Sequence, residues 1–413
     1  MEAGTTASER SAAATIEFER VSKRFDREAI RAGAGGAVEE LSLTVPAGRI
    51  CVLVGPSGCG KTTTLKMVNR LVDPTSGRIL LDGQDVASRH VTELRRGIGY
   101  VIQQVGLFPH QTIAQNVATV PRLLGWPVAR QRARSEELLA TVGLDPARYC
   151  DRYPSQLSGG ERQRVGVARA LAADPPVMLM DEPFGAVDPI VRERLQNEFL
   201  RLQEELAKTI LFVTHDIDEA IKMGDLVVVM QQGGRIAQAG APSDLLVAPA
   251  SEYVARFVGA DRGLKRLSLF RVSDVPLEDA CLVRVGDDAV TTRQRLRDEG
   301  VEYALLVDHE RRPVGWIAQA DIPGAGSLDE GHGDPESPIL DPRTTLKDAT
   351  SMLLAAEVQT GVVVDRGGRV LGLVTLDAVM SWMRDDRSRE VPEDIAAAAA
   401  EAVTIADGEA PGA

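Results

Sequence analysis

The sequence has no run of about 18 or more consecutive apolar residues, the length that a membrane-spanning helix requires, so we expect no part of the chain to cross a bilayer. Residues Met1–Ala14 lack the apolar core of a signal peptide and are predicted to be disordered. Cysteine is scarce, and Cys51, Cys59, Cys150 and Cys281 have neither metal-site nor disulfide-framework spacing. Scattered cysteines favour a reducing cytosol.

Basic residues are outnumbered as well, because 47 Lys and Arg stand against 60 Asp and Glu and give a net charge of −13. Neutralising nucleic-acid phosphates takes an excess of Lys and Arg, so the composition argues against a general affinity for nucleic acid. Contents of 44% hydrophobic and 26% charged residues are typical of a soluble globular protein. At 413 residues the chain is too long for one ordinary core, and we expect two or three domains.

The most informative stretch is the glycine-rich segment Gly55–Thr62, which matches the pattern G-x-x-x-x-G-K-[ST]. The apolar run Ile50–Val54 precedes it as a short strand, and residues 63–71 follow with apolar side chains at helical spacing. Backbone N–H groups of such a loop converge on phosphate oxygens, and the helix N-terminus adds a favourable dipole. We therefore predict a nucleotide site in which Lys61 reaches the β- and γ-phosphates and the Thr62 hydroxyl ligates Mg²⁺. The predicted contacts here are Gly55, Pro56, Ser57, Gly58, Cys59, Gly60, Lys61, Thr62 and Thr63.

Two further apolar runs end in polar side chains. Residues 176–180 lead into Asp181 and Glu182, and Thr209–Thr214 is followed by His215. Because the carboxyl ends of parallel strands meet at one edge of a sheet, we expect these side chains in the same site. A histidine at such a position can also be a satisfied core residue, but the neighbouring polar strand ends favour a role in the site.

In their order, these motifs resemble the ABC-transporter ATPase family over about residues 15–261. Gly55–Thr62 is similar to the phosphate loop of that family, Leu157–Glu161 to its signature motif and residues 186–188 to its D-loop. The resemblance implies an α/β fold: a P-loop ABC-type ATPase domain with a mixed sheet core and a helical subdomain at about residues 104–173.

The resemblance also implies roles for single residues. Asp181 is expected to hold Mg²⁺, Glu182 to orient or deprotonate the attacking water, and His215 to contact the γ-phosphate. Gln103 matches the Q-loop and is assigned to both catalysis and the metal. The implied catalytic residues are Glu182, His215 and Gln103, the metal ligands are Thr62, Gln103 and Asp181, and the remaining nucleotide contacts are Phe25, Ser158, Gly159, Gly160 and Asp188.

The role of Phe25 has two readings. Its ring could stack on the nucleotide base, or it could pack within an ordinary hairpin. The charged, glycine-rich insertion at residues 26–36 follows directly and could displace the loop, so both readings stay open.

Residues 158–160 offer a hydroxyl and backbone N–H groups at a predicted helix start, which makes a second phosphate cradle. One chain cannot easily place both cradles on a single γ-phosphate. The family resolves this by pairing two copies head to tail, with ATP between the phosphate loop of one copy and the signature of the other. The resemblance thus implies ATP, Mg²⁺ and a homodimer.

Longer stretches are similar to the ATP-binding subunits of quaternary-amine importers, whose cargo is glycine betaine, choline, carnitine or proline betaine. The resemblance implies an ATPase that energises import from the cytoplasmic face of the membrane, with transmembrane permease subunits and an extracytoplasmic substrate-binding protein as partners. The apolar surface from residue 107 to residue 147 is expected to dock the permease. The similar stretches are residues 61–71, 98–110, 120–127 and 180–190.

Two alternatives to a quaternary-amine importer are an importer with another cargo and another class of ABC ATPase. An importer ATPase for a different small polar solute would share every catalytic residue. A soluble ABC ATPase that acts on nucleic acid or ribosomes fits less well, because this chain has one ATPase module and a net charge of −13.

The pattern of the sequence changes after Ala260, and residues 261–263 are a predicted linker. Residues 303–318 and 360–375 each read as strand, turn and strand after a helix, with an offset of 57 residues. This pattern resembles a tandem α+β pair of cystathionine-β-synthase-type (CBS) domains at about 265–325 and 335–387.

The CBS resemblance implies regulation by ionic strength or by an adenine-containing ligand, whereas a dimerisation module without a ligand is the alternative. Asp321 follows Gly315 by six residues, the usual spacing for an acid that faces the ligand. Asp377 follows Gly372 by only five residues, which puts the nucleotide pocket of the second copy in doubt.

The segment Glu390–Ala413 carries six acidic residues and no Lys or Arg. Residues 396–400 could form a weak helix, but we expect this acidic tail to be disordered. Pairing of the tail with a basic surface, and its release by salt, is a hypothesis that stands beside plain solvation.

Overall fold

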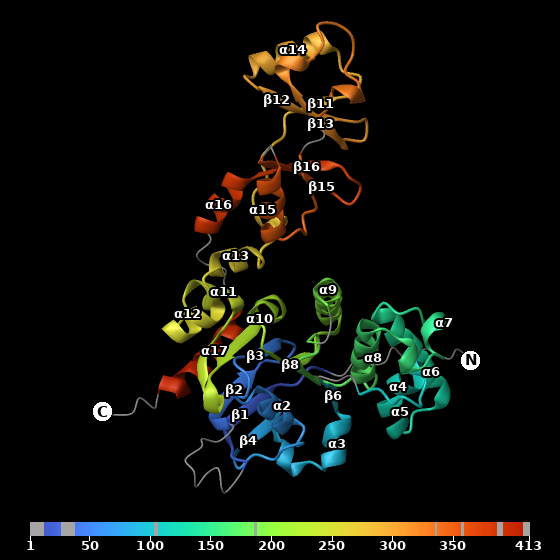
Figure 1. Cartoon of the computed structure of the whole chain (residues 1–413), viewed down its shortest axis with the longest axis vertical. Helices are drawn as coiled ribbons and strands as arrows, with labels where there is room; N and C mark the ends of the chain where they lie inside the picture. The colour runs from blue at the N-terminus through green and yellow to red at the C-terminus, as the bar shows by residue number, and fades with distance from the viewer. Residues whose placement is uncertain are drawn as a thin grey trace, which may run out of the picture. The chain divides into compact units, whose positions relative to one another are not determined.

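The computed structural model describes residues 12–25, 38–102, 106–185, 188–334, 337–356, 359–385 and 391–407. The chain divides into two compact units (Figure 1). One unit joins Met1–Ala260 to Val391–Ala413, and the other is Asp261–Glu390. In the described ranges no helix is both long and apolar enough to span a membrane.

The first unit is built on a six-stranded sheet in the order β10-β9-β3-β8-β7-β6. The strands from β9 to β6 are parallel, and β10 runs antiparallel to β9 at one edge. Strands β3, β7, β8 and β9 are buried along their whole length, which explains why their sequences are continuous apolar runs. The bounds are β3 (Ile50–Val54), β6 (Ile98–Val101), β7 (Val177–Asp181), β8 (Thr209–Thr214), β9 (Leu226–Met230) and β10 (Ile236–Gly240).

A second, antiparallel sheet has the order β2-β1-β4-β5. Its inward side chains, such as Ile16 and Leu43, belong to the same buried cluster as Leu53 of β3 and Leu65 of α2 (Lys61–Val68). The helix that begins at the glycine-rich loop is therefore part of the core that both sheets share. The bounds are β1 (Ile16–Lys23), β2 (Val38–Val45), β4 (Ser76–Leu81) and β5 (Gln84–Asp85).

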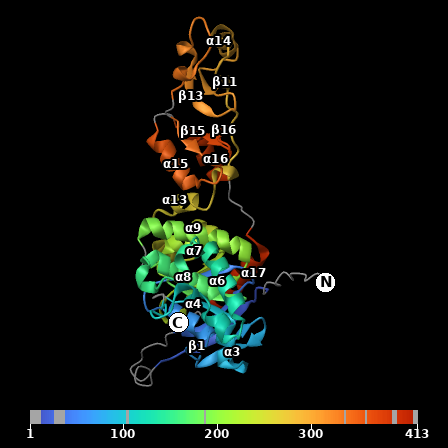
Figure 2. The same ribbon diagram turned by 90° about the vertical axis from the view of Figure 1, so that its right-hand side faces the viewer.

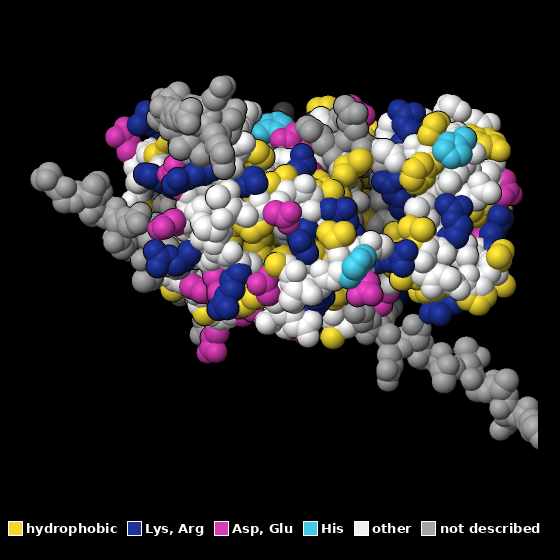
Figure 3. Space-filling model, turned by 90° about the horizontal axis from the view of Figure 1, so that it is seen from below, with side chains coloured by type: hydrophobic (Ala, Val, Ile, Leu, Met, Phe, Trp, Pro, Cys, Tyr) yellow, Lys and Arg dark blue, Asp and Glu magenta, His cyan; other side chains and the backbone are white. Residues whose placement is uncertain are grey.

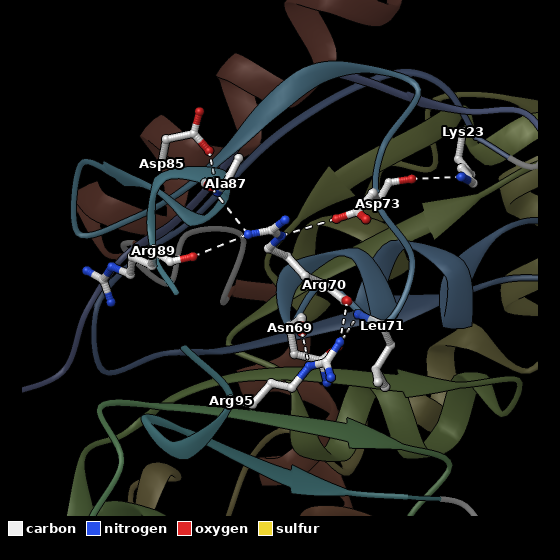
Figure 4. A network of polar contacts seen from close by, with 9 residues as sticks. All are labelled: Lys23, Asn69, Arg70, Leu71, Asp73, Asp85, Ala87, Arg89 and Arg95. Carbon is white, nitrogen blue, oxygen red and sulfur yellow. Dashed lines mark hydrogen bonds and ion pairs between the residues drawn. The ribbon is translucent and has the colours of Figure 1, made fainter. Parts of the chain in front are cut away.

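Two arginines fix the far end of α2 to the following segment, which contains η1 (Val86–Ser88) and α3 (Val91–Arg96) (Figure 4). Arg70 donates from Nε to Asp73 at 3.1 Å and from Nη1 to the carbonyl oxygens of Ala87 and Arg89, both at 3.3 Å. Arg95 donates to the carbonyl oxygens of Asn69 and Arg70 at 3.1 and 2.6 Å. These bonds anchor α2 at the end opposite the glycine-rich loop.

A group of helices forms a separate lobe of the first unit (Figure 1), and Figure 2 looks directly onto these helices. The lobe ends with α8, which leads back to the sheet strand β7. Its members are α4 (Ile113–Val117), α5 (Thr119–Leu123), α6 (Val128–Thr141), α7 (Pro146–Tyr149), η2 (Pro154–Gln156) and α8 (Gly159–Leu171). The remaining helices before residue 261 are α9 (Pro189–Leu206), α10 (Ile217–Met223), η3 (Gln232–Gly234), α11 (Pro242–Val247) and α12 (Glu252–Val258).

The second unit consists of two repeats of one pattern: a strand, a helix and a strand pair. In each repeat the first strand is parallel to the second and the third is antiparallel to it. Corresponding strands begin at Tyr303 and Thr360, so the offset of 57 residues that the sequence indicates is present in the structure. The first repeat has β11 (Leu282–Arg284), α14 (Ala289–Asp298), β12 (Tyr303–Val307) and β13 (Pro313–Ala318), and the second has β14 (Ile339–Leu340), α15 (Leu346–Ala355), β15 (Thr360–Val364) and β16 (Val370–Thr375).

The repeats differ after their third strand. In the second repeat, α16 (Leu376–Asp385) follows β16 directly, whereas in the described residues of the first the short turns η5 (Gln319–Asp321) and η6 (Glu330–His332) follow β13. The linker predicted at residues 261–263 is wrong for its last two residues, because Arg262 and Gly263 begin the helix α13 (Arg262–Leu267). Leu267 of this helix joins the buried cluster of the second repeat. A further turn, η4 (Val272–Asp274), lies between α13 and β11.

The expected disorder of the acidic tail is wrong for its first part. Residues Glu393–Asp407 form the helix α17, which belongs to the first unit. Ile395, Ala398 and Ala402 are at most 3% exposed and join the core cluster of the two sheets. Composition misled here because small apolar side chains at helical spacing bury one face of a segment that otherwise looks polar. The last residues, 408–413, lie outside the described ranges, as do residues 1–11 of the predicted N-terminal disorder.

Candidate nucleotide-binding site

The glycine-rich loop joins the carboxyl end of β3 to the start of α2. Lys61, 6% exposed, donates from Nζ to the carbonyl oxygens of Gly55 at 2.7 Å and Pro56 at 2.9 Å. A Cβ at Gly55 would lie 2.5 Å from the carbonyl oxygen of Met230, so only glycine fits where the loop passes β9. The loop backbone therefore lies close to the sheet, and the loop's own carbonyl oxygens hold the Lys61 ammonium.

Thr62 and Asp181 meet although 119 residues separate them along the chain. The Thr62 hydroxyl, at the start of α2, donates to Asp181 Oδ1 at 2.9 Å at the end of β7. Burial raises the pKa of the Asp181 carboxyl, and the hydrogen bond from Thr62 opposes that rise. A hydroxyl and a carboxylate are hard oxygen donors, and a Mg²⁺ ion that also binds phosphates and water needs few protein ligands. The pair fits such an ion.

Glu182 and His215 lie side by side at the ends of neighbouring parallel strands, β7 and β8. His215 Nδ1 is 3.1 Å from Glu182 Oε1, and the Glu182 backbone N–H donates to the Val213 carbonyl oxygen at 2.9 Å. Glu182 has a φ of 47°, in the left-handed region that non-glycine residues rarely occupy. The backbone thus turns sharply after Asp181, and strained residues of this kind gather at functional sites.

Ser158 begins α8 with a capping box. Its Oγ accepts a hydrogen bond from the Glu161 N–H at 3.3 Å, and its own N–H donates to Glu161 Oε2 at 2.7 Å. Gly159 and Gly160 occupy the first turn, and a Cβ at Gly159 would meet no atom within 4 Å. Among the described residues, no hydrogen bond or ion pair joins this turn to the glycine-rich loop, and the two lie on different lobes (Figure 1).

Known proteins are similar to this chain in sequence over most of its length. The family described as ABC transporter matches residues 38–185, and the family described as CBS domain matches residues 334–385. The osmoprotectant import ATP-binding protein OsmV of Salmonella typhimurium is 43% identical over 91% of this chain and 97% of its own length. The choline transport ATP-binding protein OpuBA of Bacillus subtilis is 42% identical over 90% of this chain and 96% of its own.

The chain belongs to the ABC-transporter ATP-binding proteins. A solved structure, cbiO1 from Clostridium perfringens, described as part of the ABC transporter complex cbiONQ, agrees. It covers 62% of this chain and 94% of its own with 25% identity and a TM-score of 0.52. Membership confirms the predicted ATPase of the ABC type and the predicted CBS fold after it.

The other predicted site residues of this ABC ATPase have mixed outcomes. The Phe25 side chain is 62% exposed, with the Lys23 ammonium 5.4 Å from its ring centre, so it does not pack inside a hairpin core and base stacking stays a prediction. Asp188 caps α9 by accepting from the Val191 N–H at 3.1 Å, and its contact with nucleotide also stays a prediction. Gln103 and residues 186–187 of the D-loop lie outside the described ranges.

Sequence reasoning missed the residues that hold the His215 loop. Gln196 of α9 donates to Glu219 of α10 at 3.1 Å, and Thr214 also hydrogen-bonds the Glu219 carboxyl, whose pKa is raised by burial. Asp216 caps α10 by accepting from the N–H groups of residues 218 and 219. An acid at the N-cap with Glu three residues later is a recognisable helix start, so the cap could have been found, whereas the Gln196 contact depends on tertiary packing.

Proposed function

We propose that this chain is the ATP-hydrolysing subunit of an importer for quaternary-amine osmoprotectants such as glycine betaine, choline, carnitine or proline betaine. The observation that carries the proposal is the length of the matches: relatives named for osmoprotectant, choline and glycine betaine/carnitine/choline transport cover at least 90% of this chain and 96% of their own. These matches run past the ATPase unit into the repeats, beyond what the generic ATPase motifs require. An ABC importer ATPase for another small polar solute is the second candidate.

The site residues divide the work of ATP hydrolysis. Lys61 would exchange its carbonyl partners for phosphate oxygens, and Thr62 and Asp181, together with Gln103, would hold Mg²⁺. The ion supplies positive charge that offsets the phosphate oxygens. Glu182 orients or deprotonates the attacking water, and His215, already 3.1 Å from Glu182, holds that carboxylate and the γ-phosphate in line. Phe25 and Asp188 are assigned to the nucleotide as further contacts.

A second copy completes the site. The first-turn N–H groups of Gly159 and Gly160 in the signature turn can bind an anion, yet this turn lies on a different lobe from the glycine-rich loop of its own chain (Figure 1). Head-to-tail pairing gives each ATP one loop and one signature. A symmetric homodimer meets this requirement with a single kind of interface.

The helical lobe is the surface we assign to the permease. Four large apolar side chains there are well exposed: Phe108 by 40%, Leu123 by 54%, Leu124 by 43% and Val128 by 80%. In Figure 3 apolar side chains recur over this right-hand lobe among basic ones. Docking of transmembrane subunits would hold the chain at the cytoplasmic face of the membrane, and a substrate-binding protein would deliver the solute on the other side.

The repeats supply a regulatory module in this proposal. The second repeat is the one that the CBS family matches, and the first repeats its strand order and pairing. We infer a sensor of ionic strength or of an adenine-containing ligand, with dimerisation alone as the alternative. Asp321 and Asp377 are both exposed, so neither is committed to the core.

Uptake by the complete transport complex in vesicles tests the proposal. Labelled glycine betaine, choline and carnitine are offered in parallel, with ATP enclosed and the salt concentration varied. We expect ATP-dependent uptake of at least one quaternary amine that responds to salt. ATP-dependent uptake of an unrelated solute, with none of the amines transported, would select the second candidate instead.

A further inference from the structure

A tyrosine outside every motif hydrogen-bonds the signature glutamate. Tyr149, at the end of α7, is 7% exposed, and its hydroxyl donates to Glu161 Oε1 at 2.5 Å. The other carboxylate oxygen of Glu161, Oε2, accepts the Ser158 N–H at 2.7 Å. Both oxygens of this one carboxylate are therefore used, one by α7 and one by the first residue of the signature turn.

The Glu161 carboxylate decides how the signature turn presents its donors. Because the Ser158 oxygen accepts from the Glu161 N–H, its hydroxyl proton stays available for an incoming anion. The Ser158 N–H, by contrast, is bound to the carboxylate. The bonds from Tyr149 and Ser158 lower the pKa of Glu161 to about 2, so this geometry depends on a carboxylate that stays charged.

The position of Tyr149 is itself supported by cation–π contacts and by backbone hydrogen bonds of its segment. Two guanidinium groups lie near its ring, that of Arg148 at 5.4 Å and that of Arg152 at 5.1 Å from the ring centre. The segment that carries it is pinned to α4, because the N–H of Ile113 donates to the Arg152 carbonyl at 2.8 Å and that of Ala114 to the Cys150 carbonyl at 3.0 Å. The hydroxyl thus comes from a held scaffold rather than from a free loop.

We propose that Tyr149 is a positioning residue for ATP hydrolysis: through Glu161 it holds the signature turn in the shape that engages the nucleotide bound to a second copy. The inference rests on the proposed head-to-tail homodimer and adds a residue to its interface machinery. Tyr149 does not touch nucleotide. Without its hydroxyl, one oxygen of Glu161 loses its partner, and the carboxylate can swing toward water and release the Ser158 N–H.

The test uses the full-length chain with Glu182→Gln as the parent and adds Tyr149→Phe to it. The parent should bind ATP but hydrolyse it slowly, so that the ATP-bound dimer persists during the measurement. Sedimentation gives the dimer dissociation constant in saturating Mg-ATP, and a fluorescent ATP analogue gives nucleotide affinity at concentrations where the chain is monomeric. A hydrogen bond to a charged group is strong enough for Tyr149→Phe to weaken the dimer about tenfold. Nucleotide affinity of the monomer should stay unchanged, since its own loop is untouched.

Two controls separate positioning from damage. Tyr303→Phe removes a hydroxyl from a side chain that is 56% exposed in the second unit and should change neither constant. In a Glu161→Ala background, Tyr149→Phe should have almost no further effect on the dimer, because the acceptor is already gone. A variant that had lost its fold would show a lower nucleotide affinity and a lower melting temperature. A weaker dimer with unchanged nucleotide affinity therefore excludes a loss of folding.

The outcomes are distinct. An unchanged dimer constant in Tyr149→Phe, beside a parent that dimerises with ATP, overturns this inference and leaves the proposed function intact. A parent that never dimerises with ATP overturns the homodimer and this inference with it. Equal effects of Tyr149→Phe with and without Glu161 would show that the tyrosine acts by another route.

Discussion

The polar side chains at the strand ends are the residues that sequence reasoning placed best. Asp181, Glu182 and His215 each follow an apolar run, and the parallel pairing of β7 with β8 brings the glutamate and the histidine within 3.1 Å. A local pattern sufficed because parallel strands deliver their ends to one edge. The contacts of Gln196 and Tyr149 could not be predicted, since each depends on how two separate helices pack against one another.

Glu182→Gln should bind ATP normally and lose hydrolysis by roughly 10²-fold or more, because an amide cannot take a proton from water. Phosphate release and equilibrium ATP binding measure the two effects. Glu252→Gln, on a side chain that is 85% exposed in α12, is the matched control and should turn over at the normal rate. Near-normal turnover of Glu182→Gln would remove that residue from its catalytic role.

At the scale of elements, local composition and tertiary burial disagree most clearly at α17. A segment rich in alanine and acids reads as a solvated tail, yet its apolar face lies in the core of the ATPase unit. One charge pair accompanies the apolar contact: Arg49 donates from Nε and Nη2 to both carboxylate oxygens of Asp394 at 2.7 and 3.2 Å. The chain therefore leaves the ATPase unit near residue 260 and returns to it near residue 391.

Ile395→Ala should lower the free energy of unfolding of the ATPase unit by about 2–4 kcal/mol, as truncation of a fully buried aliphatic side chain usually does. Ile395 is 1% exposed, whereas Ala396 on the same helix is exposed, so Ala396→Ser serves as the control. Denaturant unfolding followed by hydrogen exchange of α17 gives the comparison. If the two variants unfold alike, α17 is not part of the core.

At the scale of the whole molecule, the order of the ATPase unit and the two repeats could be predicted from the sequence. The return of the C-terminal segment to the ATPase unit could not. The offset of 57 residues between the repeats and the set of ATPase motifs can be read from the sequence, because both depend on residue types at fixed spacings along the chain. A contact between residue 49 and residue 394 has no such signature. The same limit applies to the second copy: the lone chain shows a loop and a signature on separate lobes (Figure 1), and the family resemblance had to supply the pairing.

Mixing two inactive variants tests the central claim, which is that each ATP is bound between two copies and is hydrolysed there. One chain carries Lys61→Ala in its loop, the other replaces Ser158 by a bulky Trp in its signature, and each alone should be nearly inactive. A head-to-tail dimer of the two retains one intact composite site, so random mixing should restore about a quarter of the normal hydrolysis rate. A mixture that is no more active than its separate parents would contradict the account.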